Sequence, residues 1–167
     1  MKQLTLALAF LFSLSLSAQY WQQKVDYTMN VELDAETADY TGTQQLVYTN
    51  NSPETLTKVF YHLYFNAFRP ESDMAIRLKN GGDKNRRFKV SIDSLTAFQQ
   101  GYLKVSSLKQ DGFPVQTVES GTILEVTLNT PLISGASTVL DLTFNGHVPD
   151  MIRRGGKNTK EGVAFSM

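Results

Sequence analysis

The sequence lacks cysteine altogether and contains only two histidines among its 167 residues. The absence of cysteine excludes disulfides, thiolate nucleophiles, iron–sulfur clusters and cysteine zinc sites, and also the lipid-anchoring cysteine of a bacterial lipoprotein. An excess of charge of one sign is lacking too, because sixteen basic residues balance sixteen acidic ones. Since such a chain has no long-range field that attracts phosphates, a nucleic-acid partner is disfavoured. The length suits one domain of ordinary size.

One stretch of the chain is strongly apolar, and it lies at the N-terminus. Lys2 precedes an apolar run, Leu4–Leu16, and the small residues Ser17 and Ala18 follow this run. A cationic start, an apolar run of roughly 7 to 15 residues and a boundary of small residues are typical of a secretory signal peptide. The run is shorter than the roughly 20 residues of a membrane-spanning helix. We therefore expect a signal peptide over residues 1–18, a mature domain over residues 19–167, no membrane span, and export to the periplasm or the medium.

The mature chain begins with patterns of period two, which predict β-strands. Apolar residues at every second position from Val25 to Leu33 predict a half-buried strand. A second strand is expected over Tyr40–Tyr48, where Gly42 permits either a bulge or a close backbone approach. Leu56–Phe68 is apolar on both alternating faces, which favours one strand covered on each side.

The second half of the chain repeats this alternation between turns. The polar segment Arg69–Arg87 predicts a long excursion with at most one short strand or helical turn. Asp111 and Gly112 lie between two β-prone runs, which is a strong hairpin signal. The expected strand segments are Phe88–Ile92, Leu103–Leu108, Phe113–Val118, Leu124–Leu128 and Leu140–Phe144. The prediction is an all-β, mainly antiparallel fold, and periodicity leaves open whether it is a sandwich or a single saddle-like twisted sheet.

No catalytic apparatus is visible in the sequence. It contains no H-E-x-x-H motif and no G-x-S-x-G elbow, and its acidic residues are dispersed. We expect His62 to be a strand histidine with a hydrogen-bond partner and His147 to be an exposed loop histidine, rather than metal ligands. The clustered cations of the glycine-rich loops are expected to be solvated; they are Arg86, Arg87, Arg153, Arg154 and Lys157. The prediction is therefore that this chain contributes no catalytic, metal-binding or substrate-binding residue and binds no cofactor.

Three groups of residues resemble the N-terminal part of the zinc aminopeptidases of peptidase family M-one, the gluzincins that include aminopeptidase N and leukotriene hydrolase. The first, Tyr27–Asp34 with Tyr40–Gly42, is similar to that family's opening strand pair. The second, Leu46–Pro53 and Val59–Pro70, is the most specific and looks like the segment of exported Bacteroidetes-type members. The third follows the closing strands of the domain; it consists of Gly121–Leu128, Pro131, Leu132, Gly135, Phe144–Gly146, Val148, Pro149 and Ile152–Gly155.

The resemblance implies a saddle-shaped β domain that packs against a thermolysin-like catalytic domain of the same polypeptide. In that family, zinc is held by two histidines of H-E-x-x-H and a later glutamate, and a G-x-M-E-N stretch binds the free amine of the peptide. This chain has neither motif, and Ala164–Met167 stops at or before the position of the family's pocket glutamine or glutamate. We therefore expect a fragment that is inactive alone, with zinc, peptide substrate and catalytic partner belonging to a longer parent.

Two other functions compete with this interpretation. A free-standing periplasmic module could bind peptide or carbohydrate through the aromatic residues of Tyr61–Phe68, although aromatic strands usually form core. A secreted structural protein would leave the resemblance of the second group unexplained. The sequence alone leaves side-chain preference, oligomeric state and the exact cleavage site open.

The N-terminal pattern generates a prediction about processing. Because the cationic start, apolar run and small-residue boundary fit a signal peptide, protein recovered from the periplasm or the medium should begin near Gln19. N-terminal sequencing measures this directly. A cytoplasmic protein that retains Met1 would contradict the assignment.

Overall fold

The structure is a computed structural model, which describes residues 21–81, 91–150, 156–158 and 162–164. The expected signal peptide, the strand residues Phe88 and Val90, and four of the clustered arginines lie outside these residues. These arginines are Arg86, Arg87, Arg153 and Arg154. Within the described ranges, no helix has the length and apolar character required to cross a bilayer.

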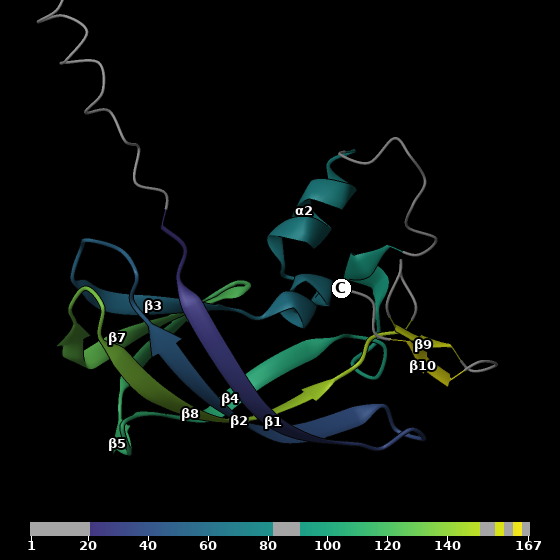
Figure 1. Cartoon of the computed structure of the whole chain (residues 1–167). Coiled ribbons are helices and arrows are strands. Elements are labelled where there is room, and N and C mark those ends of the chain that lie inside the picture. Colours follow the sequence, from purple (N-terminus) through teal and green to yellow (C-terminus); the bar gives the residue numbers. More distant parts are fainter. Residues whose placement is uncertain (1–20, 82–90, 151–155, 159–161, 165–167) are drawn as a thin grey trace, which may run out of the picture.

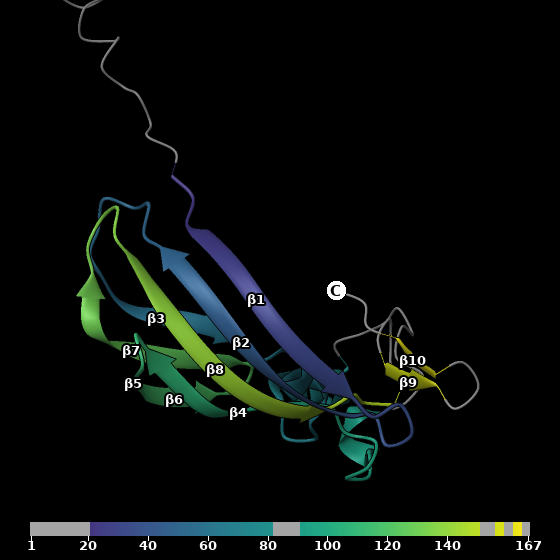
Figure 2. The ribbon, with the colours of Figure 1, turned by 60° about the horizontal axis from the view of Figure 1, so that its bottom comes forward.

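The fold consists of two antiparallel sheets and a short hairpin, which confirms the all-β prediction (Figure 1). Sheet A has five strands in the order β1 (Lys24–Leu33), β2 (Asp39–Thr49), β8 (Ser137–His147), β4 (Tyr102–Gln110) and β5 (Phe113–Pro114). Sheet B has the order β3 (Leu56–His62), β7 (Ile123–Leu132) and β6 (Gln116–Ser120). The hairpin pairs β9 (Gly156–Asn158) with β10 (Gly162–Ala164). Figure 2 shows β1, β2 and β8 side by side as long curved strands.

The core lies between the two sheets, so the sandwich is the correct alternative. Sheet A contributes an alternating row on β8, in which Leu140, Leu142 and Phe144 are buried. Sheet B contributes Leu124 and Val126 on β7, and the residues of both sheets belong to one apolar cluster. Because side chains of a strand alternate between its faces, the sequence pattern alone places these residues on the same side. The prediction for both strands is confirmed.

The Asp111–Gly112 hairpin is also confirmed. Both residues have positive φ angles, 49° and 87°, as the favoured two-residue hairpin turns require. The strand after this turn differs from the prediction, because Phe113–Val118 is divided between the two sheets. β5 pairs with β4 for two residues, and β6 then pairs with β7 of sheet B. The chain thus crosses from one layer to the other within this segment.

Gly42 is a site of close approach and not of a bulge. The register runs without a shift from β1 through β2 to β8. A Cβ atom on Gly42 would lie 2.5 Å from Phe144 Cζ and 2.7 Å from the Asn30 carbonyl oxygen. Since real Cβ contacts are longer, only glycine leaves room for the ring of Phe144 here.

The aromatic segment Leu56–Phe68 forms a shorter strand than predicted. β3 ends at His62, and residues Tyr64–Phe68 form the 3-10 helix η1. The cause is Asn66, whose buried amide accepts a hydrogen bond from the Leu103 N–H at 2.8 Å and donates one to Glu119 at 3.1 Å. These contacts, distant in sequence, hold the backbone in a turn. The prediction that both faces of this strand are covered is also wrong, because Phe60 on β3 is 59% exposed.

The polar excursion contains one helix and one further helical turn. Ser72 caps the helix α2 (Asp73–Lys79) by accepting a hydrogen bond from the Ala75 N–H at 3.1 Å. Ile92, expected in a strand, begins the 3-10 helix η2 (Ile92–Ser94) instead. Ala75, Ile92 and Leu95 form a second, smaller apolar cluster. Ile92 is buried against Ala75 of α2 and not against a sheet, which accounts for the difference between the predicted strand and the observed helical turn.

The first strand was predicted to be half-buried, and this prediction is wrong about the burial. β1 forms as expected, but all ten of its residues are exposed. Its apolar row lies on the face of sheet A that carries the core, since Tyr27 is opposite Leu46 and Leu33 is opposite Tyr40. The described part of sheet B does not bury this edge.

The packing generates a prediction about stability. Phe144→Ala removes a ring that is 8% exposed and contacts Tyr40 edge-on, so it should lower the free energy of unfolding by about 3 to 5 kcal/mol. Phe60→Ala is the matched control, because this ring is 59% exposed, and should change stability by about 0.5 kcal/mol or less. Urea unfolding of both variants measures the difference. Equal losses would contradict the assignment of the core face.

Candidate functional site

The two histidines differ in their surroundings, and both differ from expectation. His62 lies exposed at the end of β3, where its ring stacks on Tyr64 with centroids 5.2 Å apart. No hydrogen-bond partner is found for it among the described residues. His147 is buried, with 8% of its surface exposed, at the end of β8 in the middle of sheet A. The prediction of an exposed loop histidine is therefore wrong.

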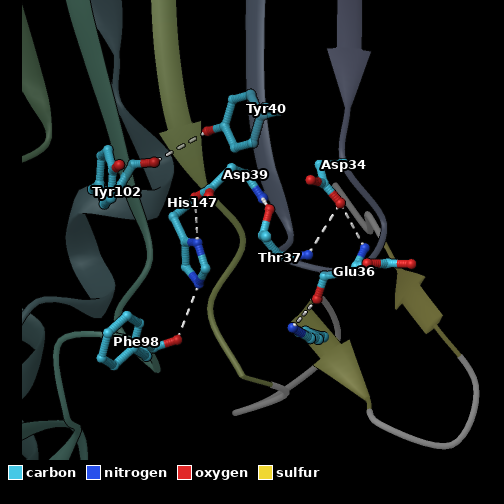
Figure 3. Close-up of polar contacts among 9 residues, drawn as sticks. Asp34, Glu36, Thr37, Asp39, Tyr40, Phe98, Tyr102 and His147 are labelled. Carbon is cyan, nitrogen blue, oxygen red and sulfur yellow. Dashed lines mark hydrogen bonds and ion pairs between the residues drawn. The ribbon is translucent and has the colours of Figure 1, made fainter.

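The imidazole of His147 connects three separate segments (Figure 3). Its Nδ1 lies 2.7 Å from Asp39 Oδ1 at the beginning of β2. Its Nε2 lies 3.1 Å from the carbonyl oxygen of Phe98 in the loop before β4. The ring of Tyr102, from the first residue of β4, stacks against it with centroids 6.3 Å apart. This group of four residues is called the histidine clamp below.

The register of the strands brings the clamp together. Asp39 and Tyr102 are the direct cross-strand neighbours of His147 on its two sides. Because Phe144 faces the core, alternation places His147 on the opposite face of sheet A. Much of that face is exposed, as at Thr143, but the segment that contains Phe98 covers its end at His147. The sequence signal that was missed is that His147 directly follows Gly146, the last position of the buried alternating row on β8.

The turn between β1 and β2 fixes the position of Asp39. The Asp34 carboxylate accepts hydrogen bonds from the N–H groups of Glu36, at 2.8 Å, and Thr37, at 3.1 Å. These bonds from the backbone of Thr37 and Glu36 lower the pKa of Asp34 below its usual value. The N–H of Asp39 in turn donates to the Thr37 hydroxyl at 3.2 Å. The turn therefore presents Asp39 to the imidazole in a defined place.

Tyr40 and Gly146 secure the inner side of the same strand ends. The Tyr40 hydroxyl donates to the Tyr102 carbonyl oxygen at 3.2 Å, and burial raises the pKa of Tyr40 above its usual value. A Cβ atom on Gly146 would collide with the ring and hydroxyl of Tyr40. Tyr40 is thus held between β8 and β4, directly behind the clamp.

The clamp holds separate segments of the chain together through the two ring nitrogens of His147. Both ring nitrogens of His147 face an oxygen atom at hydrogen-bond distance, so both are engaged in contacts within the protein. In this arrangement neither nitrogen points to an open position where a metal ion could bind. In the described part of the chain, no group of three or more His, Asp or Glu side chains is placed to hold a metal ion.

Lys157, the one described member of the clustered cations, also has a structural contact. Its Nζ donates to the carbonyl oxygen of Glu36 at 2.7 Å, and its backbone N–H donates to the Pro149 carbonyl oxygen at 2.7 Å. The expectation that it is merely solvated is therefore wrong. It joins the β9 strand to the turn that positions Asp39.

A solved zinc metallopeptidase shares the fold of this chain, whereas no family model and no curated protein matches its sequence. An M1 zinc metallopeptidase from Deinococcus radiodurans is similar with a TM-score of 0.50 and 18% identity, over 81% of this chain and 24% of that one. A mutant of that metallopeptidase bound to a Tyr-Ser-Ala substrate gives a TM-score of 0.49 and 19% identity, over 80% and 23% of the two chains. This chain thus spans about a quarter of the length of the structures that it matches.

The clamp generates a prediction about coupling. His147→Ala leaves the Phe98 carbonyl oxygen unpaired and should lower the free energy of unfolding by about 1 to 3 kcal/mol. Combined with Asp39→Ala, the loss should fall short of the sum of the two single losses by about 0.5 kcal/mol or more. Urea unfolding of the double-mutant cycle measures this, and His62→Ala is the control for loss of an exposed imidazole. Strictly additive losses would show that Asp39 and His147 do not interact.

Proposed function

We propose that residues 19–167 of this chain are the non-catalytic N-terminal β domain of a zinc aminopeptidase. The observation that carries the proposal is the fold, which corresponds over 81% of this chain to 24% of the M1 zinc metallopeptidase from Deinococcus radiodurans. The three groups of residues that resemble this domain in family M-one also support it, since they include parts of β1, β2, β3, β7 and β8.

The domain acts as a scaffold in this proposal. Its two sheets share one apolar core, and the histidine clamp joins the beginning of β2, the end of β8 and the beginning of β4 at the edge from which the chain continues toward β9. Hydrolysis of the N-terminal peptide bond is assigned to a catalytic domain elsewhere in a longer polypeptide, which also holds the zinc ion. The residues described here contribute position, not proton transfer or metal binding.

The parent enzyme is proposed to be exported and of the Bacteroidetes type. The cationic and apolar N-terminus supports export. The residues Leu46–Pro53 and Val59–Pro70 support the finer family assignment, because they carry the most specific resemblance. Because the chain has no cysteine, the stability of the domain does not depend on disulfide formation in this environment.

The free-standing binding module has less support. Its binding surface was to be the aromatic side chains of Tyr61–Phe68, but Tyr61 and Phe65 pack against the main apolar cluster. Among those aromatic residues, Tyr64 is the strongly exposed one, at 68%. One ring stacked on His62 is a small platform for a sugar or peptide.

The proposed function predicts that the purified mature chain retains no stoichiometric zinc and does not cleave aminoacyl anilides. Elemental analysis after dialysis and an aminopeptidase assay with added zinc measure both properties. A recombinant M1 aminopeptidase assayed in parallel is the positive control. Tight zinc binding with turnover that His62→Ala abolishes would overturn the scaffold assignment.

A further inference from the structure

The outer strand β1 carries an apolar row that nothing in the described structure covers. Every second side chain is large, apolar and between 37% and 59% exposed; the row consists of Val25, Tyr27, Met29, Val31 and Leu33. Because the row continues the core-bearing face of β2, it is an organised surface and not a set of scattered exposed residues. Contiguous apolar surface of this kind marks an interface.

The free edge of β1 is also unprotected. The strand pairs with β2 over all ten residues without a register shift, and it contains neither proline nor glycine. Natural edge strands are usually short, bulged, or interrupted by proline or charge, because an open edge templates pairing with another strand. Among the described strands, none pairs with the other side of β1. Its position at the rim is clear in Figure 2.

The sequence of β1 is complementary to itself in one antiparallel register. If a twofold axis passes through Thr28, Tyr27 lies opposite Met29 of the second copy and Val25 lies opposite its Val31. The apolar rows of the two copies then join on one face. In the same register, Lys24 of each copy lies opposite Glu32 of the other, which gives an opposite-charge pair at both ends of the contact.

Within β1, the neighbouring registers lack these opposite-charge pairs. A twofold axis at Met29 keeps the apolar rows on one face but places Asp26 opposite Glu32 in two like-charge pairs. An axis between two residues pairs an apolar position with a polar one and places the two rows on opposite faces. Lys24 is available for the contact, since its side chain is 63% exposed and its partner in the single chain, Asp26, is 59% exposed.

We propose that two copies of this chain associate edge to edge through β1, antiparallel about Thr28, so that the two five-stranded sheets form one continuous sheet. The isologous contact uses the same strand of each copy, as a closed twofold dimer requires. The apolar row provides the attraction, and the Lys24–Glu32 pairs select the register. This inference is independent of the proposed enzymatic parent.

Analytical ultracentrifugation of the mature chain over a range of concentrations tests the proposal. The wild-type chain should form a dimer, and Val31→Lys should be monomeric because it places two charges in the joined apolar row. Val118→Lys is the matched control, since Val118 is 63% exposed on the other sheet, and it should leave the dimer intact.

A charge-reversal cycle tests the register. Lys24→Glu and Glu32→Lys each create two like-charge pairs and should raise the dimer Kd by about 2- to 30-fold, whereas the double variant should restore it. The proposal is overturned by a wild-type chain that stays monomeric, by a dimer that persists in Val31→Lys, or by a double variant that is not rescued. A monomer whose β1 becomes protected from hydrogen exchange only in a longer polypeptide would assign this face to another domain instead.

Discussion

The pairing of β8 on both of its edges is the constraint on which the rest of the structure depends. β8 lies between β2 and β4, and it contacts β2 over eleven consecutive residue pairs. A slip of one residue would turn Leu140, Leu142 and Phe144 away from sheet B and expose the whole row. Gly42 and Gly146 fix the same register, because each leaves room for an aromatic ring that no other residue would allow. The core, the clamp and the course of the chain toward β9 all follow from this register.

The two faces of sheet A are covered by different means. On the inner face, sheet B buries the alternating apolar residues of β2, β8 and β4. On the outer face, the Phe98 loop covers the strand ends and supplies the carbonyl oxygen that His147 faces. Among the described strands, β1 has one neighbour, β2, and it lies beyond both covers, so its apolar row is exposed there. In the described part of the chain, sheet B has three strands and sheet A has five, so sheet B does not extend over β1.

Periodicity and turn chemistry in the sequence were sufficient to predict most of the fold. The alternating rows identified β1, β7 and β8, and the Asp111–Gly112 pair identified its hairpin. What covers a row could not be predicted, because periodicity says which residues share a face but not which distant segment lies on it. For this reason β1 proved exposed and His147 buried. The end of β3 was missed for a related reason, since Asn66 turns the chain through contacts with Leu103 and Glu119.

The central claim is that this β domain is the scaffold of a zinc aminopeptidase whose catalytic residues lie elsewhere in the same polypeptide. The most direct test is to sequence the DNA that follows codon 167 in the source genome. The account predicts an in-frame continuation that encodes an H-E-x-x-H motif and a later zinc-binding glutamate. A stop codon followed by an unrelated reading frame, with no such motif, would contradict it.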